Sequence, residues 1–462
     1  MKSIYLRNKF WLKDWLNGSP VRGVYNYVRY FDTHSPEECK PLQDAALQRI
    51  MDIAVRESPF YAEHIESLGL NRAPQLSDFP IIRKKDIIEN YDRMLVNPSR
   101  IEGQEGRPLQ ERHTTGSTGI KMNMKFSHQK MLHRMCELKY FSRLEGFKSH
   151  ERMVVVHSLE LSGDDQRTGK VHCRQSDDKD GNILSLYLCG LDDCSMDMLY
   201  RILVKEQAVM LRAYVGIVAA LAAYVVKSGL PKPGIRLASC VGEMLTDDVR
   251  KRIKEGLGCE ACSLYAMEEL GLLAADAVPT LDEGNVKRLN HSGYIFEVLA
   301  LDSDKPVPFG QPGRLIVTDL FNNAFPIIRY DIGDIVAQQK GDESSHGWPQ
   351  LESIQGRVVD IVRAADGTGI IPFVISKAFK AVNYVGRWQF VQKSHSKYKI
   401  RLDNIEGCDV PGLVAYYKTL LGRDADISVI GVERIPTLPS GKTKLIINET
   451  GLATMEAFNG KN

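Results

Sequence analysis

The feature that most constrains the fold is an alternation of apolar strands and helices between residues 199 and 265. A helix is followed by the apolar run AYVGIVAALAAYVV (213–226), a PKPG turn, the strand IRLASCV, a helix over residues 246–255 and the strand ACSLYAM. Strands that alternate with helices are typical of βαβ units in a layered α/β domain. The apolar run lies between Arg212 and Lys227 and is shorter than the ~20 residues of a membrane span, so we interpret it as a buried helix. We therefore expect an α/β fold with no transmembrane segment.

The rest of the chain divides into a large and a small part. Up to about residue 105, apolar residues recur three and four apart, which predicts helices. From there to about residue 335, short β-branched strands such as RMVVVHS and GRLIVTDL alternate with helices. The polar, glycine-rich stretch GDESSHGWPQ precedes a shorter strand–helix–strand segment of roughly 100 residues, a size typical of a separate domain. The sequence predicts a large N-terminal domain (1–359) and a small α+β C-terminal domain (360–462), with the boundary near Asp360.

The amino-acid composition limits which binding partners and which cellular compartment we expect. The 462 residues include 60 Lys or Arg and 58 Asp or Glu, a formal net charge of +2, which favours small-molecule partners and gives no reason to expect a nucleic acid. Nine cysteines without a disulfide-like spacing are typical of a reducing compartment, so we expect a cytoplasmic protein. Cys259 and Cys262 form a lone C-x-x-C pair, and since a structural zinc needs four ligands we interpret them as core thiols. The first 20 residues predict an amphipathic helix that docks on the protein's own body or, alternatively, touches a membrane surface.

A loop at residues 111–121, ERHTTGSTGIK, has the composition of an anion-binding turn. Its glycines let the backbone approach a ligand closely, and its hydroxyl side chains and free N–H groups suit phosphate oxygens. It is not a Walker-type loop, because Gly119 is followed by Ile120, Lys121 and the strand-like MNMKFS instead of a helix. Taken alone, such a stretch is more often an ordinary surface turn. The motifs that follow along the chain favour a phosphate loop within a hairpin.

Five further motifs follow in a fixed order. They are CVGEML (240–245), LYAMEELG (264–271), FPIIRYDIGDIV (325–336), QGRVVDIV (355–362) and PTLPSGKTK (436–444). Together with the loop they resemble the adenylate-forming superfamily of acyl-CoA synthetases. The resemblance is closer to its branch of phenylacetate-CoA ligase-like proteins, which includes adenylate-forming proteins of capsule-polysaccharide biosynthesis, and it extends from about residue 40 to 450. It implies the large N-terminal layered α/β domain of this superfamily and a small, mobile C-terminal domain.

The resemblance assigns the nucleotide to residues of the large domain. The family's phosphate loop, which closes over the β- and γ-phosphates of ATP, matches Thr114, Thr115, Gly116, Ser117, Thr118 and Gly119. Gly242 and Glu243 match the backbone that wraps around adenine, and Tyr265 and Ala266 stand in the motif whose tyrosine stacks on the other face of the base. An aromatic ring and backbone amides suit a purine. Without these neighbouring motifs, Tyr265 would be read as an ordinary core tyrosine.

Four later positions match the family's ribose, hinge and catalytic residues. Asp334, in YDIGD, matches the carboxylate that accepts both ribose hydroxyls, and Arg357 matches the arginine that reaches toward the nucleotide sugar. Asp360 matches the hinge at which the small domain swings between two half-reactions. Lys442, about eighty residues later, matches the adenylation lysine, whose charge would stabilise the transition state at the α-phosphate. By themselves, an IGD aspartate and an SGK lysine are most simply turn residues.

One motif departs from the family pattern. The family's Y-G-x-T-E reads Tyr265, Ala266, Met267, Glu268 and Glu269, so alanine replaces glycine and glutamate replaces threonine. Glu269 still matches the catalytic, magnesium-binding carboxylate. Glu268 stands where a hydroxyl would touch the α-phosphate, and a carboxylate there is repulsive unless a cation lies between them. Either Glu268 shares in holding the cation, or the protein has lost turnover on a decayed ligase fold.

The resemblance implies an ATP- and Mg²⁺-dependent ligase. A small-molecule carboxylic acid would be joined to AMP and then passed to coenzyme A or to another acceptor, such as an amine or a sugar, by a chain that acts alone or as a homodimer. Surface-polysaccharide biosynthesis and aromatic-acid catabolism both stay open as the setting. The acid pocket carries no portable sequence code; His157, Tyr214 and Gly216 lie in candidate segments for its lining. The competing hypothesis is a nucleotide-binding or scaffold protein without catalysis.

Overall fold

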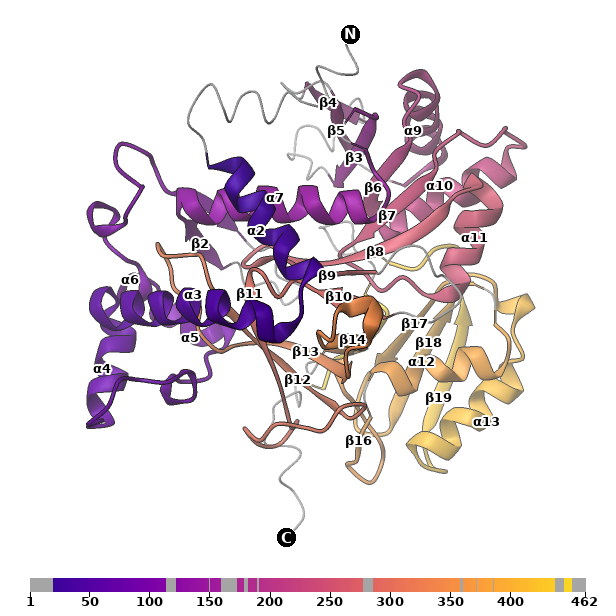
Figure 1. Ribbon diagram of the computed structural model, residues 1–462. Coiled ribbons are helices and arrows are strands. Elements are labelled where there is room, and N and C mark those ends of the chain that lie inside the picture. Colours follow the sequence, from indigo (N-terminus) through magenta and orange to yellow (C-terminus); the bar gives the residue numbers. More distant parts are fainter. Residues whose placement is uncertain are drawn as a thin grey trace.

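The computed structural model has a large and a small lobe (Figure 1). It describes residues 20–113, 122–148, 150–158, 173–177, 182–188, 191–276, 286–357, 360–370, 372–384, 386–436 and 444–450. The large lobe is built around a twelve-stranded sheet, and the small lobe, which follows residue 357, around a four-stranded one. Helices pack on both sheets, which confirms the predicted α/β class with a separate C-terminal domain.

The large sheet is parallel on one side and antiparallel on the other. Its strands are β3 (Met153–Ser158), β4 (Cys173–Asp177), β5 (Ile183–Leu188), β6 (Met210–Tyr214), β7 (Leu237–Val241), β8 (Glu260–Met267), β9 (Gly271–Asp276), β10 (Lys287–Leu289), β11 (Tyr294–Leu299), β12 (Pro312–Asp319), β13 (Tyr330–Gln339) and β14 (Gln350–Arg357). Strands β5, β3, β6, β7 and β8 are parallel neighbours in that order. From β8 the sheet continues through antiparallel pairs to β9, β10, β14, β13, β12 and β11. The parallel half is a set of short apolar strands, as expected where helices cover the sheet.

The large lobe begins with a group of helices, as the sequence predicts. The helices of this lobe are α2 (Val21–Thr33), α3 (Pro36–Glu57), α4 (Pro59–Ser67), α5 (Lys84–Glu89), α6 (Tyr91–Met94), α7 (His128–Leu144), α9 (Asp193–Lys205), α10 (Val215–Lys227) and α11 (Asp247–Leu257), with single 3₁₀ turns η1 (Leu76–Asp78), η2 (Pro98–Arg100) and η3 (Glu343–Ser345). A capping box starts α3, because Ser35 Oγ accepts the Glu38 amide while the Glu38 carboxylate accepts the Ser35 amide. None of the described helices is long and apolar enough to cross a membrane.

The buried helix predicted for residues 213–226 is confirmed as α10, except that its first two residues belong to a strand. Residues 210–214 form β6, which pairs with β7 so that Tyr214 is opposite Val241, and α10 begins only at Val215. The sequence hides this boundary because the apolar run continues through it, and because the N-cap residue Tyr214 makes no side-chain cap. Helix α11 is preceded by Thr246, whose hydroxyl accepts the Val249 amide and so marks the start of the helix.

A buried charged cluster lies inside the large lobe. Lys130 of α7 and Asp319 at the end of β12 are both fully buried, with Nζ and Oδ2 2.6 Å apart. Lys130 also donates to the Tyr294 hydroxyl at 3.1 Å. Glu137, two turns along the same face of α7, is fully buried, and this burial raises the pKa of its carboxyl to about 7 against the pull of Lys130, with Asp319 adding to the rise. The cluster ties α7 to β12, and removing one partner would leave a buried charge uncompensated.

The small lobe has its own sheet and core. Its strands are β15 (Val362–Arg363) and β16 (Gly369–Ile370), which form a hairpin, and β17 (Trp388–Gln392), β18 (Lys397–Leu402), β19 (Asp426–Gly431) and β20 (Ile446–Asn448), which form a mixed sheet in the order β19-β18-β17-β20. Helices α12 (Pro372–Ala381) and α13 (Val410–Leu421) and the turn η5 (Ile405–Gly407) complete it. Buried apolar residues of these elements form a cluster of their own. The lobe lies against the large lobe below α11 (Figure 1).

Candidate active site

The predicted phosphate loop joins two paired strands. β1 (Gln110–His113) and β2 (Asn123–Phe126) are antiparallel, with His113 opposite Asn123 and their side chains 2.7 Å apart at Nδ1 and Oδ1. The strands on either side of the loop therefore form the hairpin that the sequence predicts. The loop residues themselves lie outside the described residues: Thr114, Thr115, Gly116, Ser117, Thr118 and Gly119.

A cavity of about 510 Å³ lies between the two lobes. Cavities of this size are typical of sites for small organic ligands and cofactors. Its wall includes five residues that the sequence assigns to the nucleotide: Gly242, Glu243, Tyr265, Ala266 and Asp334. The small lobe contributes the aromatic rings of Phe379, Tyr384 and Trp388 and the guanidinium of Arg387. The site is thus closed by both lobes.

Tyr265 and Asp334 meet at the wall of this cavity. The Tyr265 hydroxyl, on β8, donates to Asp334 Oδ2, on β13, at 2.5 Å. Asp334 is only 6% exposed and lies within a strand, so the alternative of a turn aspartate is wrong. Arg357 is the residue opposite Asp334 in the pairing of β13 with β14. Three positions far apart in the sequence, all predicted to contact the nucleoside, therefore converge from three strands.

The Gly242–Glu243 turn follows β7 directly. Gly242 has φ +74°, a left-handed conformation that glycine adopts without strain. The Glu243 carboxylate accepts the Gly216 amide at 2.7 Å, in the first turn of α10. Gly216, a candidate for the acid pocket, also lines the cavity. Burial raises the pKa of Tyr214, the residue before α10, and the nearby carboxylates of Glu243 and Glu268 add to the rise.

Glu268 and Glu269, the two glutamates of the motif that differs from the family pattern, lie in different environments. Glu269 is 7% exposed and accepts a hydrogen bond from the Tyr330 hydroxyl at 3.3 Å. The Glu268 side chain is 43% exposed and lies 3.7 Å from the guanidinium of Arg112, on β1 just before the phosphate loop. Arg112 is therefore a cation that offsets the negative charge introduced by Glu268.

A single buried carboxylate is a suitable protein ligand for Mg²⁺. This ion is commonly held by one or two carboxylates and completes its coordination with phosphate oxygens and water. Glu269 fits that arrangement. Across the described residues there is no group of three or more His, Cys, Asp or Glu side chains that could form a metal cage of protein ligands alone, and Cys259 and Cys262 are buried free thiols.

An ion pair joins Asp360 to the segment of Lys442. Lys444 Nζ lies 2.9 Å from Asp360 Oδ1, and both side chains are largely buried. The Lys444 carbonyl accepts a hydrogen bond from Gln389 Nε2 of β17 at 2.7 Å. Lys442 lies outside the described residues, two positions before this anchor. The predicted hinge and the small-lobe sheet therefore both hold the end of the lysine segment.

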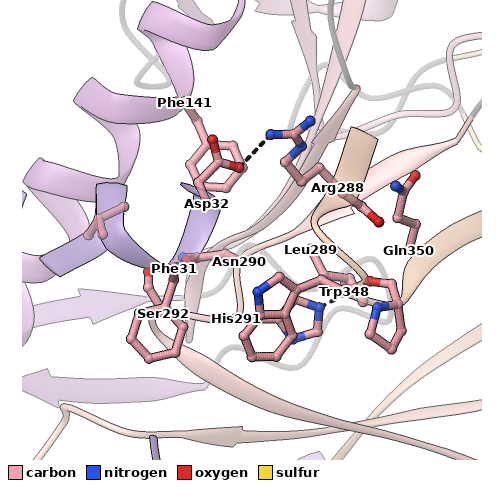
Figure 2. A pocket seen from close by; sticks show the side chains of 13 residues that line it. Phe31, Asp32, Phe141, Arg288, Leu289, Asn290, His291, Ser292, Trp348 and Gln350 are labelled. Carbon is pink, nitrogen blue, oxygen red and sulfur yellow. Dashed lines mark hydrogen bonds and ion pairs between the residues drawn. The ribbon is translucent and has the colours of Figure 1, made fainter. Parts of the chain in front are cut away.

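A second, much smaller cavity of about 20 Å³ lies on the large lobe (Figure 2). Figure 2 shows Asp32 facing Arg288, whose guanidinium donates to that carboxylate at 2.6 Å. Below them, His291 stacks on Trp348 with ring centroids 4.2 Å apart. A space of this size holds about one water molecule, so it is no site for a nucleotide or an organic acid.

The chain is similar to known proteins in both sequence and fold. Residues 362–449 match the family described as the CapK C-terminal domain. This match lies within the small lobe. Protein CapK of Staphylococcus aureus is 24% identical over 452 residues, which cover 93% of this chain and 95% of that protein. Phenylacetate-coenzyme A ligase of Thermus thermophilus is 29% identical over 93 residues, 20% of this chain and 21% of the ligase.

The fold of the whole chain has a close counterpart among crystal structures. That of 2-hydroxyisobutyryl-CoA ligase in the postadenylation state, in complex with 2-HIB-AMP, matches with a TM-score of 0.68 at 17% sequence identity and covers 93% of both chains. The chain therefore has the fold of the adenylate-forming ligases, and the predicted resemblance to their phenylacetate-CoA ligase-like and CapK-like branch is confirmed.

Sequence reasoning missed the residues that approach the site from outside the motifs. Arg112 precedes the phosphate loop but belongs to no motif, and Arg387 follows α12 in a stretch without any recognisable signature. The only signal near Arg387 is the apolar run WQFVQ, which predicts a buried strand and says nothing about the cavity. Contacts between lobes depend on how the lobes sit together, which no local pattern encodes.

Proposed function

We propose that this protein activates a carboxylic acid with ATP and passes the acyl group to coenzyme A or another acceptor. The observation that carries the proposal is the contact of Tyr265 with Asp334 at a cavity that is also lined by the Gly242–Glu243 turn, with Arg357 paired opposite Asp334 in the sheet. A buried carboxylate beside a tyrosine ring and a glycine turn suits the ribose hydroxyls and base of a nucleoside. The surrounding fold is that of the acid–CoA ligases.

The proposed chemistry has two steps. A carboxylate oxygen of the acid attacks the α-phosphorus of ATP, a new P–O bond forms, the bond to the bridging oxygen breaks and pyrophosphate leaves. The acceptor thiol then loses its proton to water and attacks the acyl carbon, and AMP leaves. A free carboxylate is a poor acyl donor because oxide is a bad leaving group, whereas AMP is a good one.

We assign roles to this chain's own residues on the same basis. Asp334 would accept the ribose hydroxyls, Tyr265 would stack on the base, and Glu269 would bind Mg²⁺, which supplies charge neutralisation at the phosphates. Lys442 would stabilise the charge that develops at the α-phosphate. Asp360 would be the hinge between domains 1–359 and 360–462, about which the small domain turns between the two steps.

For the setting, we propose surface-polysaccharide biosynthesis. The relative that matches over nearly the whole chain is Protein CapK, whereas the phenylacetate-coenzyme A ligase matches over 93 residues only. The acid therefore need not be phenylacetate, and a sugar or amine acceptor is consistent with the proposal.

The test of the proposal is ATP–pyrophosphate exchange with a panel of carboxylic acids. We expect at least one acid to support exchange, with product thioester or amide formed when an acceptor is added. Tyr265→Phe is the matched variant: it keeps the ring and removes only the hydroxyl bonded to Asp334, so exchange should fall several-fold without being abolished. No exchange with any acid, together with no ATP binding in calorimetry, would contradict the proposal.

A nucleotide-binding role without catalysis is the second candidate, and the replacements at Ala266 and Glu268 favour it. The nearby Arg112 argues against it, because it supplies the cation that Glu268 needs beside a phosphate. Glu268→Thr separates the two. If Glu268 is a working part of the site, the change lowers exchange; a sharp rise in exchange would instead indicate a decayed enzyme.

A further inference from the structure

The Glu243 carboxylate is held where the two lobes meet. Its Oε2 accepts the Gly216 amide at 2.7 Å. A side-chain carbon placed at Gly216 would lie 3.3 Å from Glu243 Oε2 and 3.0 Å from Nη2 of Arg387, which belongs to the small lobe. The carboxylate of one lobe and the guanidinium of the other therefore both face the same point beside Gly216, and they attract each other electrostatically.

Arg387 is firmly attached to its own lobe. Its backbone amide donates to Asp403 Oδ1 at 2.6 Å, and the Tyr384 hydroxyl donates to the same oxygen at 3.1 Å. Burial lowers the pKa of the half-buried guanidinium, and the carboxylates of Glu243 and Asp403 act in the opposite direction. Hydrogen bonds between such charged, partly desolvated groups are stronger than those at an open surface.

The amide that Glu243 accepts has no partner within its helix. Gly216 is the second residue of α10, and the first four amides of an α-helix have no carbonyl of their own helix to bond. Glu243 is therefore anchored at the start of α10, and the charge of Arg387 faces it from the other lobe. The Gly242–Glu243 turn is the one that we assign to the adenine.

We propose that Arg387 is a positioning residue for the nucleotide: it clamps Glu243, and with it the Gly242–Glu243 turn, against α10 only while the small lobe faces the cavity. When the small lobe turns away, Arg387 leaves with it, and the adenine side of the site loosens. This inference rests on the proposed function for its nucleotide part, whereas the clamp itself does not.

Another ion pair between the lobes supplies a matched control. Lys380 Nζ, on α12, lies 3.0 Å from Asp247 Oδ2, on α11, but the two side chains are 79% and 55% exposed. An exposed pair of this kind contributes little. Lys380→Ala therefore removes a cation from the same interface without touching Glu243.

The clamp is tested by hydrogen exchange on the ligand-free full-length protein. We expect the Gly216 amide to exchange about tenfold faster in Arg387→Ala, and Arg387→Lys to lie between the two, because lysine keeps the charge and loses the planar guanidinium. Lys380→Ala should exchange like the wild type. The amides of β17 report whether the small lobe stays folded. A wild-type exchange rate at Gly216 in a folded Arg387→Ala protein would overturn the clamp.

Two milder variants keep the test decisive if Arg387→Ala does not fold. Gly216→Ala inserts a methyl group at 3.0 Å from the Arg387 nitrogen, which forces the guanidinium away. Glu243→Gln keeps the shape of the side chain and removes its charge. Both should speed exchange at residue 216 or its neighbours in the first turn of α10, and an unchanged rate in both would again overturn the clamp.

The nucleotide part is tested by calorimetry with ATP and Mg²⁺. We expect Arg387→Ala to weaken ATP binding about tenfold, and the double variant Arg387→Ala/Glu243→Gln to bind no more weakly than Arg387→Ala, because both changes break the same contact. Additive losses would overturn the positioning role. If the wild type binds no ATP, the proposed function fails and the nucleotide part with it, while exchange at Gly216 still decides whether the clamp exists.

Discussion

The two walls of the inter-lobe cavity are built differently. The large-lobe wall includes Asp334, a strand residue that is 6% exposed and accepts a hydrogen bond from the Tyr265 hydroxyl. The small-lobe wall combines buried aromatic rings, such as that of Phe379, with the half-buried Arg387, and next to it lies the exposed Lys380–Asp247 ion pair. Buried, mutually bonded strand residues cannot rearrange cheaply, whereas half-buried ones can separate. In the proposed mechanism the large-lobe wall would stay in place, and the small-lobe wall would leave when the small lobe turns.

The largest effect is expected from the proposed adenylation lysine, Lys442. Lys442→Ala should lower adenylation by roughly 10²–10³-fold, the range for loss of one transition-state charge stabiliser. Thioester formation from a supplied acyl-adenylate should stay near the wild-type rate, because in the proposed mechanism the lysine serves only the adenylation step. Single-turnover measurement of each half-reaction checks this. Equal losses in both half-reactions would contradict this role for Lys442.

At the fixed wall we expect a smaller loss that appears in both steps. Asp334→Ala removes the proposed ribose acceptor, which binds the nucleotide before and after adenylation, so each half-reaction should slow by about 10–100-fold. The loss should appear mainly as a higher KM for ATP and for the acyl-adenylate. A loss confined to one half-reaction would mean that this wall also changes between steps.

A proline at the proposed hinge should have a moderate effect, and on thioester formation only. Asp360→Pro fixes φ and so holds the lobes in one arrangement, and it also removes the partner of Lys444. Pyrophosphate exchange should persist, while thioester formation should fall by about tenfold or more. Lys444→Ala is the control, since it breaks the ion pair without restricting the backbone. Unchanged rates of both half-reactions in Asp360→Pro would show that no hinge operates there.

The smallest effect on activity, close to none, is expected from Glu137→Gln. This variant tests how a buried carboxyl contributes to the stability of the large lobe. The pKa of the Glu137 carboxyl is raised to about 7, so the folded state retains a proton that the unfolded state loses near the ordinary value of 4.5. The free energy of unfolding contributed by this group is therefore full below about pH 4.5, falls as the pH rises toward 7, and is lost above it. The charged neighbours are Lys130, Asp319 and Arg134.

Glutamine has no proton to lose, so the variant should gain stability relative to the wild type as the pH rises, by up to about 3 kcal/mol. Thermal unfolding of both proteins at pH 5 and pH 8 measures the difference. Parallel shifts of the two proteins between these pH values would contradict the assignment.

The sequence was sufficient for the parts of this structure that are local. The strands RMVVVHS and GRLIVTDL, the N-terminal helices and the hairpin around residues 114–121 all follow from apolar periodicity and turn composition. The boundary at Val215 was missed, since β6 and α10 share one apolar run and only pairing with β7 divides it.

The site shows the same division between local and distant information. The motifs identified Tyr265 and Asp334, but their hydrogen bond, and the burial of Asp334 within a strand, depend on the order of β8 and β13 in the sheet. Arg387 and the Lys130–Asp319 pair could not be predicted, because a single arginine or lysine carries no signature of the distant carboxylate that it meets.

The order of the strands in the large sheet also bears on how the chain is synthesised. β10 lies between β9 and β14, so the middle of the sheet stays open until residues 350–357 have left the ribosome. Pairings between segments distant in sequence form slowly, and an unpaired edge invites association with other chains. The four-stranded sheet of the small lobe uses only strands from residue 388 onward, so it can form after the large lobe has folded. A nascent chain stalled before β14 is therefore the form of this protein that most needs a chaperone.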